Sequence, residues 1–159
     1  GPCTVRPLVW LPESAEPFET GRLFRVSLKK PSLLLILGRS QSRKTSLARD
    51  LRNLDRHMHV STDYAYSEIV DRLRRGGKGI PEMLASRVGD GSGKACGEFN
   101  RSLEADQELL REYLNWVIEI LPRNKQLVSV EFDVLRDEAV SVMKEMLAGA
   151  GFSVWTVRR

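Results

Sequence analysis

The sequence predicts an α/β fold, namely a three-layer sandwich with a mainly parallel sheet of at least four strands. A continuous apolar run at residues 32–37, which ends at Gly38, is typical of a strand that is buried on both faces of a parallel sheet. Amphipathic helical patterns follow this run and return between the later strand-like segments. Strands and helices that alternate in this way favour parallel pairing through right-handed crossovers.

Length and composition point to one globular domain. The chain has 159 residues, of which 42% are hydrophobic and 29% are charged, and this balance excludes disordered and fibrous proteins. The longest apolar run, residues 33–37, is far shorter than the roughly 20 residues of a membrane span, so we expect no membrane partner. Two distant cysteines, Cys3 and Cys96, indicate neither a disulfide framework nor a zinc site and favour a cytoplasmic location. The net charge of +4 suits a polyanionic ligand without marking a dedicated nucleic-acid binder.

The chain is expected to divide into an N-terminal arm or edge strands at residues 1–31 and an α/β domain at residues 32–159. The arm is rich in proline, which favours extended and turn conformations. The elements predicted in the first half are extended stretches at 6–11 and 22–28, a strand at 32–37, a helix at 45–54, a strand at 57–63 and a helix at 67–75. Those predicted in the second half are a glycine-rich loop at 76–97, a helix at 99–121, a strand at 127–135, a helix at 137–147 and a strand at 152–157.

The segment between Gly38 and Thr45 carries the sharpest motif in the chain. It matches the phosphate-loop pattern G-x-x-x-x-G-K-[ST] at every defined position but one, because Arg43 stands where the second glycine belongs. In such a loop the backbone N–H groups surround the phosphates, the lysine reaches the β- and γ-phosphates, and the hydroxyl group binds Mg²⁺. The predicted nucleotide-binding residues are Gly38, Ser40, Gln41, Ser42, Arg43, Lys44 and Thr45.

With this motif the chain resembles the P-loop NTPase superfamily, in particular its small-molecule and polynucleotide kinases, with a degenerate Walker A motif. The resemblance implies that ATP or GTP binds with Mg²⁺ and that the γ-phosphate is transferred to a hydroxyl acceptor. It implies that Asp63, after the second strand, is the general base and acts with Lys44 in catalysis. It also implies that Asp133, after the third strand, binds the metal with Thr45, or that Glu131 replaces Asp133 if the register differs. The alternative for both aspartates is a helix cap or a turn.

Two departures from this family favour a second hypothesis. Arg43 brings a side chain close to the phosphate position, and no arginine-bearing lid follows the last predicted strand. The lid function is expected in the loop at 76–97, with Arg74, Arg75, Lys78 and Arg87, or it is missing. The second hypothesis is therefore a non-catalytic scaffold or regulatory module. A third, a domain that binds or acts on nucleic acid 5′ ends, draws on the basic charge and the family resemblance. Gly1-Pro2 is typical of a cleaved tag, so we expect the chain to be part of a larger protein.

Two further patterns are expected to be structural. The segment from Gly89 to Lys94 looks like another phosphate loop, but it follows no strand and has Val88 and Ala95 at defining positions, so we expect a flexible loop. His57 and His59 would share one face of a strand, but no third metal ligand is evident in the sequence.

Overall fold

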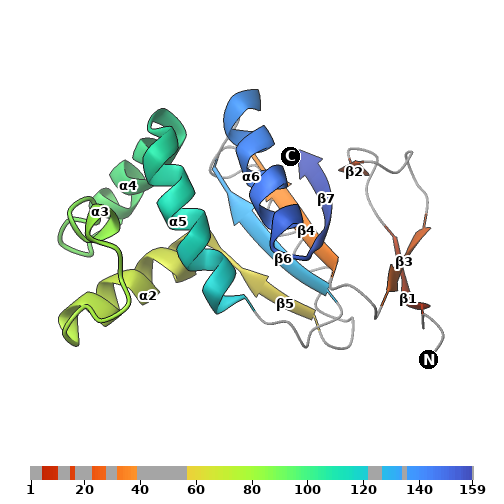
Figure 1. Cartoon of the computed structure of the whole chain (residues 1–159), viewed down its shortest axis with the longest axis horizontal. Coiled ribbons are helices and arrows are strands. Elements are labelled where there is room, and N and C mark those ends of the chain that lie inside the picture. The colour runs from red at the N-terminus through yellow and green to blue at the C-terminus, as the bar shows by residue number, and fades with distance from the viewer. Residues whose placement is uncertain are drawn as a thin grey trace.

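The described residues form one mixed sheet with helices packed against it, and a separate strand pair near the N-terminus (Figure 1). The structure is a computed structural model and describes residues 5–10, 15–16, 23–27, 32–38, 57–121, 127–133 and 136–158. In the N-terminal part, β1 (Val5–Trp10) and β3 (Leu23–Ser27) pair antiparallel with each other. The short β2 (Ala15–Glu16) instead joins the edge of the main sheet, where it pairs antiparallel with β7.

The main sheet has the strand order β2-β7-β4-β6-β5. Its centre is β4 (Ser32–Leu37), which pairs parallel along its whole length with β6 (Leu127–Phe132) on one side and β7 (Ser153–Arg158) on the other. The shorter β5 (His57–Val60) pairs parallel with β6. The strand predicted at 32–37 is thus confirmed, and its continuous apolar run follows from a central position with both faces buried.

The helices of the described residues follow β5 and β6 in the chain. They are α2 (Thr62–Arg74), α3 (Glu82–Ala85), α4 (Gly93–Ala105) and α5 (Gln107–Ile120) between β5 and β6, and α6 (Asp137–Gly149) between β6 and β7. The helix predicted at 67–75 starts earlier, at Thr62, because the Ser61 hydroxyl accepts a hydrogen bond from the Tyr64 N–H at 3.0 Å and caps the helix. The helix predicted at 137–147 is confirmed as α6.

The prediction of a single helix at 99–121 is wrong, because Asp106 divides this segment into α4 and α5. The Asp106 carboxylate accepts hydrogen bonds from the N–H groups of Glu108 and Leu109, at 3.1 and 3.2 Å, and so starts a new helix. The loop predicted at 76–97 is also wrong in part, since α3 and the first turn of α4 fall within it. The single helix was predicted because α4 and α5 bury apolar residues in the same core, so the hydrophobic pattern continues across the break.

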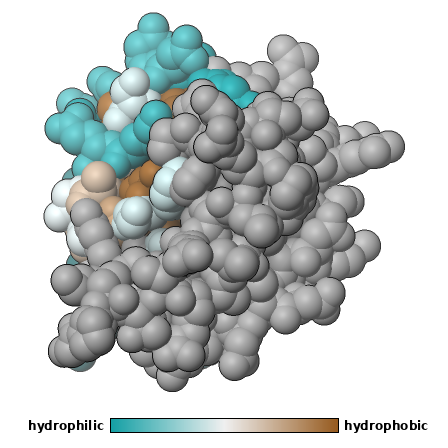
Figure 2. Space-filling model, turned by 90° about the vertical axis from the view of Figure 1, so that its right-hand side faces the viewer, coloured by the Kyte–Doolittle hydropathy of each residue, from teal (hydrophilic) through white to brown (hydrophobic). Residues whose placement is uncertain are grey.

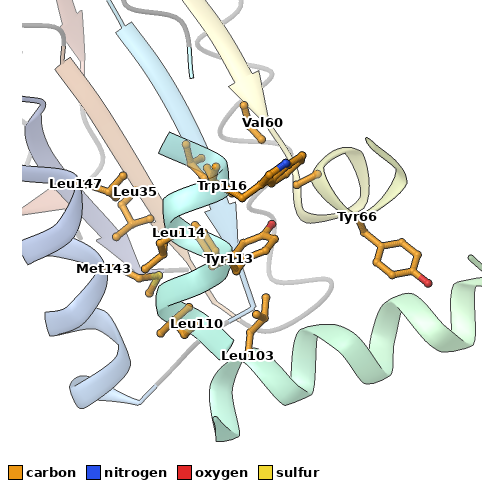
Figure 3. Packing of buried hydrophobic residues seen from close by; sticks show 14 of the residues in the cluster. Leu35, Val60, Tyr66, Leu103, Leu110, Tyr113, Leu114, Trp116, Met143 and Leu147 are labelled. Carbon is orange, nitrogen blue, oxygen red and sulfur yellow. The ribbon is translucent and has the colours of Figure 1, made fainter. Parts of the chain in front are cut away.

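The described surface is mainly hydrophilic in the view of Figure 2, and the apolar side chains gather between the helices and one face of the sheet (Figure 3). That face presents Leu35 of β4, which lies near Met143 and Leu147 of α6 and Leu114 of α5. The exposed large hydrophobic side chains of the described part are Tyr64 and Met83.

The predicted three-layer sandwich with a mainly parallel sheet of at least four strands is corrected to a small α/β unit built on three full-length parallel strands. The core contains Leu33, Leu35 and Leu37 of β4 with residues of α2 to α6, whereas Leu34 and Ile36, on the other face, are buried outside this core. The expected wide parallel sheet is reduced to three six-residue strands, β7-β4-β6, with shorter strands at either edge. An apolar run indicates that both faces of a strand are buried, and it does not identify the segments that cover them.

Candidate active site

A cavity of about 760 Å³ opens where β5 and β6 end. Its described lining residues are Asp63, Tyr66, Ser67, Gly91, Ser92, Gly93, Cys96, Gly97, Asn100, Arg101, Glu104 and Asp133. They come from the first turns of α2, from the segment before α4, from α4 itself and from the end of β6. The end of β4 is adjacent, because the Gly38 N–H donates to the Phe132 carbonyl at 3.3 Å, one residue before Asp133.

The strand order puts this cavity at the position where open parallel sheets bind ligands. From β4 the chain continues to β5 on one side, whereas from β6 it continues to β7 on the other side of β4. The neighbouring strands β4 and β6 therefore send the chain in opposite directions. A crevice forms outside the carboxyl ends of strands at such a reversal. Asp133, directly after β6, lines the cavity at this point.

Asp63 lies in the first turn of α2 and is exposed toward the cavity. Ser61 caps the helix, so Asp63 does not have the capping role that was the alternative for it. Its Oδ1 accepts a hydrogen bond from the Cys96 thiol at 3.4 Å, across 33 residues of chain. The carboxylate is thus held between the end of β5 and the start of α4.

Cys96 is a buried hydrogen-bond donor in the cavity wall. Burial raises the pKa of its thiol to about 11, and the hydrogen bond to the Asp63 carboxylate acts in the same direction. At neutral pH the group is therefore a protonated thiol and a poor nucleophile. The Asn100 side-chain amide donates to its sulfur at 3.8 Å. Asn100, Cys96 and Asp63 form a chain of polar contacts that ends on a cavity carboxylate.

Helix α4 has an apolar face toward the core and a polar face toward the cavity. Phe99 and Leu103 are buried in the core. The cavity face repeats at helical spacing and consists of Gly93, Cys96, Gly97, Asn100, Arg101 and Glu104. The Ser92 hydroxyl caps this helix by accepting from the Ala95 N–H at 3.1 Å.

The segment before α4, predicted as a flexible loop, is bonded to α2. The Tyr66 hydroxyl donates to the Val88 carbonyl and accepts from the Gly91 N–H at 3.2 Å. Asp90 accepts from the Ser92 N–H at 3.0 Å, and its hydrogen bonds with Ser92 lower the pKa of its carboxyl group. Gly91 has φ +87°, a backbone conformation that residues with a side chain rarely adopt, so glycine is favoured at this position.

The structure brings two of the predicted site residues together. Asp63 and Asp133 line the same cavity, whereas Glu131 is buried on β6, at a register position opposite Ile36, and does not line it. Gly38 is at the end of β4. The remaining predicted phosphate-loop residues lie outside the described residues, namely Ser40, Gln41, Ser42, Arg43, Lys44 and Thr45.

The basic residues expected to supply a lid do not line the cavity. Arg74 donates to the Asp90 carbonyl at 3.4 Å, Arg75 lies 4.0 Å from Glu68, and Arg87 pairs with Asp106 at 3.1 Å. Among the described lining residues the cationic side chain is instead Arg101. No motif in the sequence contains Arg101, although its spacing from Gly93 and Gly97 along α4 puts it on the same helix face as these glycines.

Comparison with known proteins identifies no relative of this chain. A scan against protein-family models, a search of curated proteins and a search of solved structures each find no match. Within the described ranges, no helix has the length and apolar character needed to cross a membrane.

Proposed function

We propose that this chain is a phosphotransferase that moves the γ-phosphate of ATP or GTP to the hydroxyl group of an acceptor in the cavity. One observation carries the proposal: Asp63 and Asp133, each at the end of a parallel strand, line one cavity beside Gly38, where the phosphate-loop pattern begins. The resemblance of residues 38–45 to a phosphate loop supports a triphosphate held by Lys44 and the loop amides.

Asp63 is the general base in this proposal. Its carboxylate takes the proton of the acceptor hydroxyl as the oxygen attacks the γ-phosphorus, and the bond from that phosphorus to the β,γ-bridging oxygen breaks to release the nucleoside diphosphate. The Cys96 thiol donates to one carboxylate oxygen at 3.4 Å and leaves the other for the acceptor. Cys96 is thus a positioning residue, because it holds the base without touching the reacting atoms.

Arg101 supplies positive charge to the reaction centre in this proposal. Phosphoryl transfer is catalysed mainly by positioning and by charge that offsets the phosphoryl oxygens. Arg101 is the cationic side chain among the described residues that line the cavity, and it lies on the helix face next to Asn100 and Gly97. It therefore takes the part that was expected of the loop at 76–97.

The donor set of the cavity fits a magnesium ion that arrives with the nucleotide. In the described residues no group of three or more His, Cys, Asp or Glu side chains is arranged to hold a metal ion. Mg²⁺ is commonly bound by one or two carboxylates together with water and substrate phosphates, and the Asp133 carboxylate is a donor of that kind. Asp133, with the hydroxyl of Thr45, would hold the ion, whose charge offsets that of the phosphates.

The test separates the proposed base from nucleotide binding. We expect Asp63→Asn to leave the affinity for Mg-ATP nearly unchanged while lowering the rate of ADP release by roughly 10²-fold or more, since a general base acts on the acceptor. Binding is measured by calorimetry and ADP release by a coupled assay. Asp71→Asn is the matched control, because Asp71 is exposed on the same helix and does not line the cavity.

Nucleotide binding itself is tested with Lys44→Ala, which should weaken Mg-ATP binding about tenfold or more through loss of a charged hydrogen bond. Absence of Mg-ATP binding by the unmodified protein would contradict the proposal. The scaffold hypothesis, which Arg43 favours, would then take its place.

A further inference from the structure

Carboxylates outnumber cationic side chains among the described residues that line the cavity, although the chain as a whole is basic. The chain carries a net charge of +4, but its described lining residues include three carboxylates, on Asp63, Glu104 and Asp133, and one guanidinium group, on Arg101. Like charges that face each other across a binding site disfavour a partner strongly. The carboxylates proposed to face the acceptor, on Asp63 and Glu104, therefore disfavour an acceptor that carries phosphate groups of its own, such as a nucleic acid 5′ end.

Glu104 is the carboxylate that the proposed transfer does not use. It lies on the cavity face of α4, about two helical turns or roughly 12 Å beyond Cys96, and is half-buried. Its backbone carbonyl accepts from Arg136 at 3.1 Å, but within the described residues its side-chain carboxylate has no hydrogen-bond or ion-pair partner. A half-buried carboxylate at the far end of a binding cavity suits a cationic group of the ligand.

The cavity wall offers hydrogen-bonding groups rather than a surface for stacking a base. Tyr66 is the aromatic residue among the described lining residues, and its ring packs against Phe99 with centroids 5.7 Å apart. Its side chain is buried and its hydroxyl group is already hydrogen-bonded. The small polar and glycine residues of the wall are Ser67, Gly91, Ser92, Gly93, Gly97 and Asn100, which suit hydroxyl groups.

From charge, shape and chemistry together we infer that the acceptor is a small compound with several hydroxyl groups and one ammonium group. Glu104 binds the ammonium group, and Asn100 and the serines of the wall bind hydroxyl groups. The hydroxyl group that receives the phosphate lies at the Asp63 end. The statement that this ligand accepts the phosphate rests on the proposed function. The inference itself concerns the binding specificity of the same site.

The test uses glucosamine and glucose as a matched pair of probes that differ only in an amine and a hydroxyl group. Calorimetry at a pH where the amine is protonated measures their affinities for the unmodified protein in the presence of a non-hydrolysable ATP analogue, and in its absence. We expect glucosamine to bind about tenfold or more tightly than glucose, since an ammonium–carboxylate hydrogen bond discriminates by that factor. In Glu104→Gln this ratio should fall toward one.

Glu98→Gln is the control, because Glu98 is exposed on the same helix and does not line the cavity. It should keep the full preference for glucosamine. A 5′-hydroxyl oligonucleotide that binds more tightly than glucosamine would overturn the inference, as would equal binding or no binding of the two sugars, or an unchanged ratio in Glu104→Gln.

These binding measurements need no turnover. An amine preference without Mg-ATP binding would refute the proposed function and leave the ligand class standing. Phosphoryl transfer to a neutral or anionic acceptor, with no preference for the amine, would support the proposed function and refute the amine-bearing ligand class.

Discussion

Cys96 is the residue on which the polar contacts of the cavity converge. Its sulfur lies 3.4 Å from Asp63 Oδ1 and 3.8 Å from the Asn100 amide nitrogen, and its side chain is 9% exposed. Burial is the largest cause of the rise in the pKa of the thiol, and the neighbouring carboxylate adds to it. A protonated thiol donates a hydrogen bond and does not compete with Asp63 for the acceptor proton.

The raised pKa of Cys96 predicts a loss of stability in alkali. An unfolded thiol titrates near 9.0 and the folded one near 11, so between these pH values the unfolded state has lost its proton and the folded state has kept it. The contribution is complete below about pH 9 and is lost as the pH rises to about 11, so the free energy of unfolding decreases over this range. Urea denaturation at a series of pH values should give a smaller decrease for Cys96→Ala than for the unmodified protein.

Comparison of the two proteins separates the contribution of Cys96, including its effect on the neighbouring tyrosines, from that of the other groups that titrate in this range. Burial also raises the pKa of Tyr66 and Tyr113, which are present in both proteins. An identical decrease in both would show that the thiol titrates normally in the folded state.

At the scale of the elements, the break between α4 and α5 determines the shape of the cavity wall. Asp106 caps α5 with two hydrogen bonds and also pairs with Arg87 at 3.1 Å, and the N–H of Asp106 bonds to Ser102 at the end of α4. The break lets α4 direct Glu104 and Arg101 into the cavity while α5 packs its own apolar face on the sheet. One continuous helix could not point Glu104 and Arg101 into the cavity and also pack the apolar face of α5 on the sheet.

Removal of this cap should destabilise the protein measurably. Asp106→Ala is expected to lower the free energy of unfolding by about 0.5–2 kcal/mol, the usual range for an N-cap, as measured by urea denaturation. Arg87→Ala removes only the partly exposed ion pair and should cost at most about 1 kcal/mol. If the two variants lose the same free energy, the ion pair rather than the cap accounts for the effect.

At the scale of the whole molecule, an aromatic cluster connects the helices after β5 to the sheet. Phe99 of α4 lies between Tyr66 of α2 and Tyr113 of α5, with ring centroids 5.7 Å apart in both pairs. Tyr113 also meets Phe132 of β6 edge to face, again at 5.7 Å. Since Phe132 directly precedes Asp133, this cluster fixes the helical wall of the cavity relative to its strand side.

Truncation of the central ring should therefore affect the stability of the whole chain. Phe99 is 1% exposed, so Phe99→Ala is expected to lower the free energy of unfolding by about 3–5 kcal/mol, as measured by urea denaturation. Tyr64→Ala is the control, because Tyr64 is an aromatic residue of α2 that is 47% exposed, and its loss should change stability by less than about 0.5 kcal/mol. A small effect of Phe99→Ala would mean that the helices pack independently of this ring.

The sequence by itself determined the features that depend on local patterns. The apolar run at 32–37, the strand that starts at Leu127 and the helix that starts at Asp137 were all readable, because strands and helices have different hydrophobic periods. Asp63 and Asp133 were chosen through the resemblance to P-loop kinases, as the acids that follow the second and third predicted strands. Their catalytic and metal-binding roles stay predictions.

The tertiary structure alone decided which distant residues meet and which layers form. The contact of Asp63 with Cys96 depends on the position of α4 beside α2. Asp63 and Asp133 line the same cavity because β5 pairs with β6. No local pattern encodes strand order, since it is set by the packing of the whole core. The break at Asp106 was not predicted, because α4 and α5 bury their apolar residues in one core and a continuous hydrophobic period cannot distinguish one helix from two.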